Sequence, residues 1–179
     1  MTTTHTITTY NINEHPDQDA VYTYIRENWD DLGQHYIDEA VDCLKSFAKY
    51  FDADLDYAVS LVPDCGEFIS LKLNIYSYDT NISELSGNRL RTYLVNNYTK
   101  IDECCPFTGV CYDETLLDSF RAFIKKPTDQ SFQDLLDDSG HNLLKDIHSE
   151  GEAIYSDEGI HELLEINEYE FLKSGDFYS

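Results

Sequence analysis

Three aspartates at alternating positions, Asp52, Asp54 and Asp56, match the opening of an EF-hand calcium loop. The sixth position of such a loop needs glycine for a sharp turn, and the twelfth needs a bidentate glutamate. Here these positions are Tyr57 and Pro63. Because both requirements fail, we expect a solvated turn leading into a strand instead of a calcium site.

The five cysteines of the chain are Cys43, Cys65, Cys104, Cys105 and Cys111. Structural zinc is usually held by two paired C-x₂₋₄-C ligand sets. The cluster from Cys104 to Cys111 lacks that spacing and has no histidine nearby, so Cys43 or Cys65 would have to complete a site through the fold. We therefore predict small, buried, apolar cysteines, no bound metal and no cofactor.

Two further patterns could support catalysis. His161, Glu162 and Glu165 resemble the metalloprotease helix H-E-x-x-H, but its second histidine is a glutamate here. A cysteine nucleophile such as Cys65 would need a base such as His35 or His141, and sequence spacing does not identify such pairs. The chain has no glycine-rich phosphate loop and no G-x-S-x-G motif. We predict that the protein is not an enzyme, with a metal-dependent enzyme as the third-ranked hypothesis.

The charge of the chain is its strongest feature. Its 179 residues include 35 Asp and Glu against 12 Lys and Arg, a net charge of −23. Aromatic residues make up 13%, more than disordered acidic chains contain, so we expect a folded protein. Direct binding to nucleic acid or to an anionic membrane is disfavoured, because no basic patch is present. A basic protein surface is the expected partner.

Hydrophobic periodicity predicts helices that position these residues. The expected helices start at His15-Pro16-Asp17, with the proline in the first turn, after a break at Asp30–Gly33, and at about Ser86 and Glu114. Thr128 can cap the next helix, and Ile160, Leu163 and Leu164 recur at helical steps after it. Alternating apolar residues at 55–62 and 69–75, around the turn Pro63–Gly66, predict a β-hairpin. We therefore expect an α+β fold with amphipathic helices around a small antiparallel hairpin, as a single domain 1–179. Residues 127–179 could form a C-terminal helical subdomain.

Acidic residues are spaced along the predicted helices so that they form faces. Residues 127–179 hold fourteen acids against Lys145 and Lys173, and residues 1–58 hold twelve acids against three bases. The candidate partner-binding residues are Asp31, Asp38, Asp42, Asp134, Asp137, Asp138, Glu158, Glu162 and Glu165.

Such a face has the dimensions of a phosphate row. Carboxylates three or four residues apart on a helix lie about 5–6 Å apart, and successive phosphates of one DNA strand lie roughly 7 Å apart. A Lys- and Arg-rich cleft that accepts nucleic acid could therefore accept this face. The alternative is that the charge serves only solubility.

In size, acidity and its carboxylate-rich faces at 27–42 and 134–170, the chain resembles the DNA-mimic inhibitors that mobile elements use against host defence, such as anti-restriction and anti-CRISPR proteins. The resemblance implies a non-catalytic inhibitor of a basic nucleic-acid-handling protein. The second hypothesis is an antitoxin- or immunity-type protein that caps one basic toxin through a Tyr-rich face. Met1–Tyr10 is polar and unlike a signal peptide, so we expect a cytoplasmic protein with reduced thiols, in the host cell if a phage encodes it.

Overall fold

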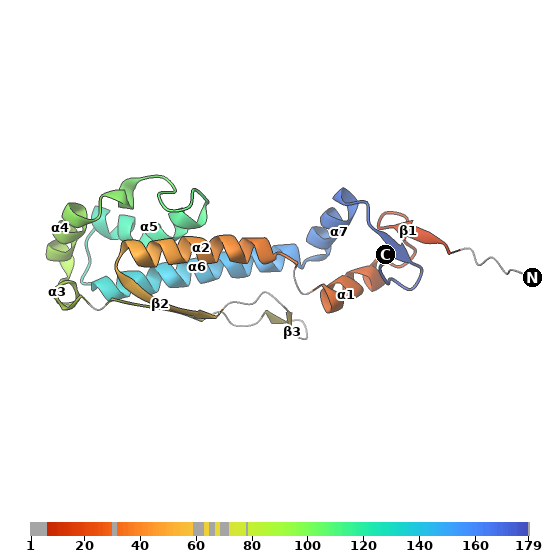
Figure 1. Ribbon diagram of the computed structural model, residues 1–179, viewed down its shortest axis with the longest axis horizontal. Coiled ribbons are helices and arrows are strands. Elements are labelled where there is room, and N and C mark those ends of the chain that lie inside the picture. The colour runs from red at the N-terminus through yellow and green to blue at the C-terminus, as the bar shows by residue number, and fades with distance from the viewer. Residues whose placement is uncertain are drawn as a thin grey trace, which may run out of the picture. The chain divides into compact units, whose positions relative to one another are not determined.

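The computed structural model describes residues 7–29, 32–58, 63–64, 67–68, 72–77 and 79–178. Among these residues helices predominate, and the described strands pair in antiparallel two-stranded ladders, which confirms the predicted α+β class (Figure 1). Contacts divide the chain into two compact units: unit 1 contains Met1–Gly33, Val62–Phe68 and Glu150–Ser179, and unit 2 contains Gln34–Leu61 and Ile69–Ser149. Residues 127–149 belong to unit 2 and residues 150–179 to unit 1, and the C-terminal subdomain 127–179 stays a prediction. The single domain stays a prediction.

Unit 1 joins the two ends of the chain. Strand β1 pairs with β6 in antiparallel register, with Thr9 opposite Leu172 and Asn11 opposite Glu170. Ile25, Ile160 and Phe171 are fully buried and belong to the core of this unit. Its elements are β1 (Thr9–Asn11), α1 (Gln18–Asn28), β3 (Pro63–Asp64), β4 (Glu67–Phe68), α7 (Asp157–Ile166) and β6 (Glu170–Leu172).

Helix α1 begins after Asp17, whose carboxylate accepts a hydrogen bond from the backbone N–H of Ala20 at 3.2 Å. The expectation that Pro16 would lie in the first turn is therefore wrong, since the capping aspartate follows the proline. The helix ends at Trp29, whose ring packs edge-on against Tyr169 at 5.3 Å. The Trp29 ring thus serves packing at the end of this helix.

The corner between α6 and α7 depends on a glycine. Ser156 caps α7 by accepting the N–H of Gly159 at 3.0 Å. A Cβ atom at Gly159 would lie 2.2 Å from the carbonyl oxygen of Ala153. No side chain fits at that distance, so glycine is required for this close approach.

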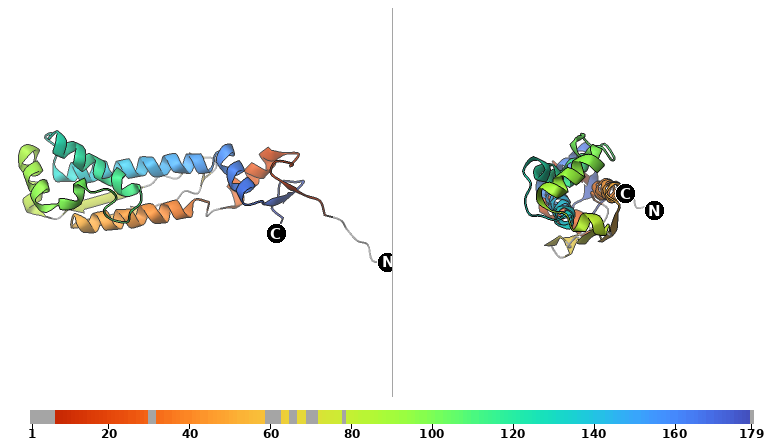
Figure 2. Two further views of the ribbon diagram at one scale, coloured as in Figure 1. Left: turned by 90° about the horizontal axis from the view of Figure 1, so that it is seen from above. Right: turned by 90° about the vertical axis from the view of Figure 1, so that its left-hand side faces the viewer.

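Unit 2 packs helices around an aromatic core. Phe51 stacks on Phe120 with ring centroids 4.4 Å apart, and Phe47 and Phe132 pack against both at their edges. All four rings are buried. The elements are α2 (Gln34–Tyr50), β2 (Ala53–Ala58), β5 (Lys72–Ser77), α3 (Thr80–Ser83), α4 (Gly87–Asn97), η1 (Thr99–Asp102), α5 (Tyr112–Lys125) and α6 (Phe132–Ile154), the last of which ends in unit 1. Helices α2 and α6 run in opposite directions (Figures 1 and 2).

The predicted hairpin is present as two ladders. β2 pairs with β5 from Ala53 opposite Ser77 to Ala58 opposite Lys72, and β3 pairs with β4 through Asp64 and Glu67. Of the predicted turn Pro63–Gly66, Cys65 and Gly66 lie outside the described residues. The aspartates of the D-x-D-x-D stretch form the turn after α2 and the exposed positions of β2, as expected for a solvated turn and strand.

Candidate functional site

Helix α7 presents the first of the predicted acidic faces. Glu158, Glu162 and Glu165 are all exposed, at helical spacing, on the surface opposite the buried Ile160 and Leu164. We call these three glutamates the α7 row. They border a hollow of about 310 Å³, lined by Tyr22, Asp157, Glu158, His161, Glu162 and Glu165.

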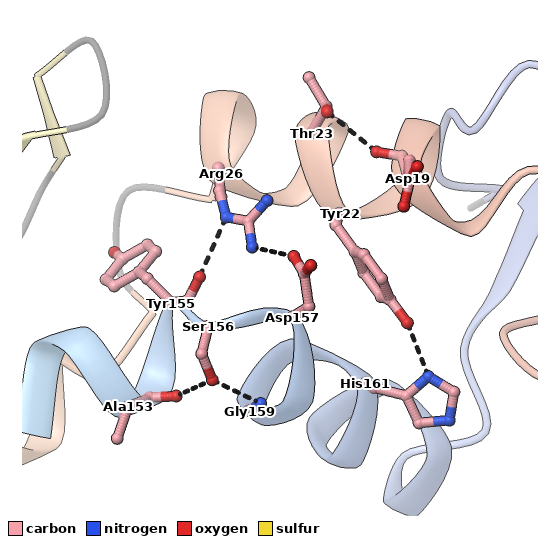
Figure 3. A network of polar contacts seen from close by, with 10 residues as sticks. All are labelled: Asp19, Tyr22, Thr23, Arg26, Ala153, Tyr155, Ser156, Asp157, Gly159 and His161. Carbon is pink, nitrogen blue, oxygen red and sulfur yellow. Dashed lines mark hydrogen bonds and ion pairs between the residues drawn. The ribbon is translucent and has the colours of Figure 1, made fainter.

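Arg26 holds Asp157, one of the residues that line this hollow (Figure 3). Its Nε donates to the carbonyl oxygen of Tyr155 at 3.0 Å, and its Nη2 forms an ion pair with Asp157. Arg26 therefore neutralises Asp157 and leaves the α7 row as the charged part of the surface. Burial raises the pKa of the Tyr22 hydroxyl above its ordinary value, and the Asp157 carboxylate adds to the increase.

His161 belongs to a directed chain of hydrogen bonds. Its Nδ1 lies 2.8 Å from the Tyr22 hydroxyl, and its Nε2 lies 3.1 Å from Oδ1 of Asn13. Nδ2 of Asn13 donates to Glu165 at 2.9 Å. Since Oδ1 of Asn13 must accept, Nε2 of His161 donates and Nδ1 accepts from Tyr22. Both ring nitrogens are thus occupied, which argues against metal binding by His161 and Glu165.

Within the described part of the chain, the carboxylates of Glu158 and Glu162 form no hydrogen bond or ion pair, whereas the carboxylate of Glu165 accepts only from the neutral amide of Asn13. An amide donor orients a carboxylate without cancelling its charge. The α7 row therefore keeps its negative charge at a surface whose shape is set by α1 and α7.

The first turns of α6 carry the second acidic face, the α6 row of Asp134, Asp137 and Asp138, all exposed. Asp137 accepts from Gln133 at 2.8 Å and Asp138 accepts from Gln130 at 2.7 Å. Neutral amides again orient the carboxylates, so these two residues match the predicted surface charges.

Asp134 has a different role from the other two. Ser131 and Asp134 form a capping box: the N–H of Ser131 donates to Asp134 Oδ2 at 2.7 Å, and the N–H of Asp134 donates to Ser131 Oγ at 3.2 Å. These bonds, from the backbone N–H and the hydroxyl of Ser131, lower the pKa of Asp134. Thr128 was expected to cap this helix; it instead bonds Gln130, because the helix starts three residues later.

The remaining predicted residues lie on α2. Asp38 and Asp42 are exposed; Asp38 accepts from Gln34 at 2.9 Å, and Asp42 lies 3.5 Å from Lys45. Asp31 lies outside the described residues. Asp38 lies in the second turn of α2 and Asp42 near its middle, whereas Asp134, Asp137 and Asp138 lie in the first two turns of α6. The α7 row belongs to unit 1. The described candidate residues therefore lie on three helices, α2, α6 and α7.

The loop before α5, residues 103–111, is built around two carboxylates that sequence reasoning treated as ordinary surface charges. Asp113 is fully buried, and its Oδ2 accepts from the N–H groups of Phe107, Thr108 and Gly109 at 2.8 to 3.2 Å. We call residues 103–111 the Cys loop. The sequence signal for this role of Asp113 was an acidic residue at a helix start that follows a Gly-containing loop. Many helices share that pattern, so it does not identify the role.

Glu114 anchors the other side of the Cys loop. Its Oε1 accepts from the N–H of Cys105 at 2.8 Å, and Arg121 forms an ion pair with it. Arg121 also donates to the carbonyl oxygens of Ile101 and Glu103. The bonds from Arg121 and Cys105 lower the pKa of Glu114 to about 2.

The cysteines differ from their predicted burial. Only Cys43 is buried among the four described, and burial raises the pKa of its thiol to about 12. Cys104 and Cys111 are exposed. The prediction of buried cysteines is wrong for this loop, because the buried Asp113 occupies its interior and turns the backbone N–H groups inward. Burial, followed by the adjacent Cys104, raises the pKa of the Cys105 thiol to about 11.

None of the helices that the structure describes has both the length and the apolar character needed to cross a membrane. Comparison with known proteins found no matching family model, no matching curated protein and no matching solved structure.

Proposed function

We propose that the protein is a non-catalytic inhibitor that binds a basic, nucleic-acid-handling protein in the cytoplasm by imitating the charge of a nucleic-acid backbone. The observation that carries this proposal is the setting of the exposed acids: Asp137, Asp138 and Glu165 are oriented by neutral amides and keep their charge. Charge cancellation within the chain is limited in any case, since 12 basic residues can pair with at most about a third of 35 acids.

The hollow beside the α7 row supports the same function. Its lining combines exposed carboxylates with the Tyr22 hydroxyl and His161. A Lys or Arg side chain of a partner would find acceptors there, with Glu158 and Glu162 unengaged by other described residues. The partner expected from this chemistry is a protein cleft rich in Lys and Arg, and not nucleic acid itself.

The antitoxin-type alternative requires a face rich in tyrosine, and the described sheet does not supply one. Tyr57 and Tyr76 are the exposed tyrosines of the β2–β5 ladder. Tyr76 lies opposite Asp54 in the register, so these two side chains share one face of the ladder. Side chains alternate between faces along a strand, and Tyr57 is three residues after Asp54, so the Tyr57 ring lies on the other face. The β2–β5 ladder therefore offers no face with two exposed tyrosines for such a partner.

The test compares two variants of equal charge. The row variant changes Asp137, Asp138, Glu158 and Glu162 to amides; the control variant changes the exposed residues Asp54, Asp56, Asp118 and Asp129 to asparagine. Asp134 is left intact because it caps α6. Both variants and the parent are immobilised, incubated with lysate at low and high salt, and eluted with duplex DNA or RNA.

We expect the parent and the control variant to retain nucleic-acid-binding proteins that salt and nucleic acid release. At about 0.4 kcal/mol for each rim charge, the row variant should bind roughly tenfold more weakly. Equal binding by the row variant and the control variant would contradict mimicry by these faces. A single small basic protein that nucleic acid does not release would favour the antitoxin-type function, and no salt-sensitive partner would favour solubility alone.

A further inference from the structure

The Cys loop brings three metal-binding side chains together. The Sγ atoms of Cys104 and Cys105 lie 3.8 Å apart, and one ligand atom from each of Cys104, Cys105 and Glu114 lies within 4.8 Å of the others. Cys104 is exposed and Cys105 is half-buried, so an ion from solution can reach them. The proposed inhibitor function does not use this group.

The surrounding bonds hold the three side chains in this arrangement. Asp113 fixes the far half of the loop through the N–H groups of Phe107, Thr108 and Gly109. Glu114 fixes Cys105 through its backbone N–H, and Arg121 fixes Glu114. Cys105 itself has a positive φ of 43°, a conformation that persists in a non-glycine residue only where surrounding contacts enforce it. The site is therefore preorganised.

The sulfur separation fits a tetrahedral ion. With Zn–S bonds of about 2.3 Å and a tetrahedral angle, two thiolates on one zinc lie about 3.8 Å apart. A direct disulfide fits less well, since it needs Cα atoms about 4.4–6.8 Å apart and adjacent residues across a trans peptide are about 3.8 Å apart. No cis peptide occurs in the described chain. The adjacent cysteines are thus better placed to share an ion than to bond each other.

Glu114 has room for a further partner. Its Oε1 accepts from Cys105 and from Arg121, and its Oε2 accepts from Arg121. The Cys104 side chain also forms a hydrogen bond with this carboxylate. A carboxylate offers about four lone-pair positions, so a bound ion can take the one that the Cys104 thiol gives up. The ligand charges also fit a divalent ion. Two thiolates and the Glu114 carboxylate carry three negative charges, the ion neutralises two of them, and the positive charge of Arg121 neutralises the third.

We propose that Cys104, Cys105 and Glu114 bind one thiophilic divalent cation, with Zn²⁺ as the physiological ion and water in the fourth position. On binding, each thiol releases its proton to solvent and its sulfur bonds the ion, with no change of oxidation state. The C-x₂₋₄-C rule excluded this site from the sequence because the cysteines are adjacent and the third ligand comes from the next helix. Binding would pin the Cys loop to α5.

The experiment starts from the reduced full-length protein, stripped with a chelator and titrated with Zn²⁺ in excess Mg²⁺, which occupies the exposed carboxylates but not thiolates. We expect one tightly bound Zn²⁺ per chain by elemental analysis. Cys104→Ser, Cys105→Ser and Glu114→Gln should each weaken binding at least about tenfold. Cys111→Ser changes an exposed cysteine of the same loop outside the group and should bind like the parent.

Cd²⁺ provides a test that needs no variant, because cadmium–thiolate bonds give an ultraviolet charge-transfer band. We expect this band to reach its maximum at one Cd²⁺ per chain. Absence of the band, absence of stoichiometric zinc, or full retention of zinc by the Cys104→Ser, Cys105→Ser double variant would overturn the proposal. Because the pull-down variants leave these residues unchanged, failure here leaves the inhibitor proposal standing, and the reverse also holds.

Discussion

The carboxylates of the α6 and α7 rows and those at the start of α5 are the same chemical group in two settings. Asp137 and Glu162 are exposed, and the donors around them are neutral or absent among the described residues. Asp113 is buried under three backbone N–H groups, and Glu114 is paired with Arg121. Both sets contribute equally to the formal net charge of the chain. Only the exposed carboxylates of the rows can contact a partner, because Asp113 and Glu114 are already bonded within the protein. Changing the second set should damage the fold instead.

The largest effect is expected at Asp113. Replacing Asp113 with alanine leaves several loop N–H groups without an acceptor, at about 1–3 kcal/mol for each group that stays buried. We expect the free energy of unfolding, measured by urea denaturation, to fall by about 3 kcal/mol or more. Asp118→Ala removes an exposed carboxylate of the same helix and should change it by under about 0.5 kcal/mol. A similar loss of unfolding free energy in Asp113→Ala and Asp118→Ala would show that the burial of a carboxylate does not determine its contribution to stability.

A medium effect is expected at Asp134. Its side chain is exposed like that of Asp137, but it accepts a hydrogen bond from a backbone N–H, as Asp113 does. Ser131→Ala and Asp134→Ala should each reduce the free energy of unfolding by about 1 kcal/mol, because each removes half of the capping box. Asp137→Ala, one turn later, is the matched control and should have little effect. If all three variants unfold like the parent, Asp134 is only a surface charge, as Asp137 is.

A smaller effect concerns pH. The pKa of Glu114 is lowered to about 2 in the folded protein, against an ordinary value of 4.5, so its ion pair stabilises the fold above pH 4.5. This contribution is lost as the pH falls from about 4.5 to about 2. Because the side chain is 38% exposed, we expect less than about 1 kcal/mol.

The measurement is the difference in unfolding free energy between the parent and Glu114→Gln at pH 6 and at pH 2.5. The difference should shrink at the lower pH. Glu162→Gln serves as the control, since protonation of a row carboxylate breaks no ion pair. A constant difference across this pH range would argue against the Glu114–Arg121 pair as a source of stability.

The smallest effect is on salt dependence. The acids outnumber the bases by 23, so repulsion among the rows should exceed pairing, and added NaCl should raise the melting temperature by screening. The row variant should respond less to salt than the parent does. A melting temperature that falls steadily from low to moderate NaCl would instead indicate that ion pairs such as Glu114–Arg121 dominate.

The sequence by itself determined the helices, the antiparallel ladder β2–β5 and the exposure of the acidic faces. Apolar residues at helical spacing bury one side of α2, α6 and α7, and local periodicity is sufficient to show this. It also indicated correctly that Asp52, Asp54 and Asp56 form a turn and a strand. These features depend on neighbours within a few residues, which a single sequence contains.

The tertiary structure alone decided which acids are engaged and which cysteines are exposed. Asp113 captures N–H groups four to six residues before it, Arg121 joins Glu114 to η1, and Asn13 reaches Glu165 from the other end of the chain. Each bond depends on backbone direction after folding, which residue type and spacing do not encode. For the same reason the vicinal pair Cys104 and Cys105 becomes a three-ligand group only when α5 places Glu114 beside it.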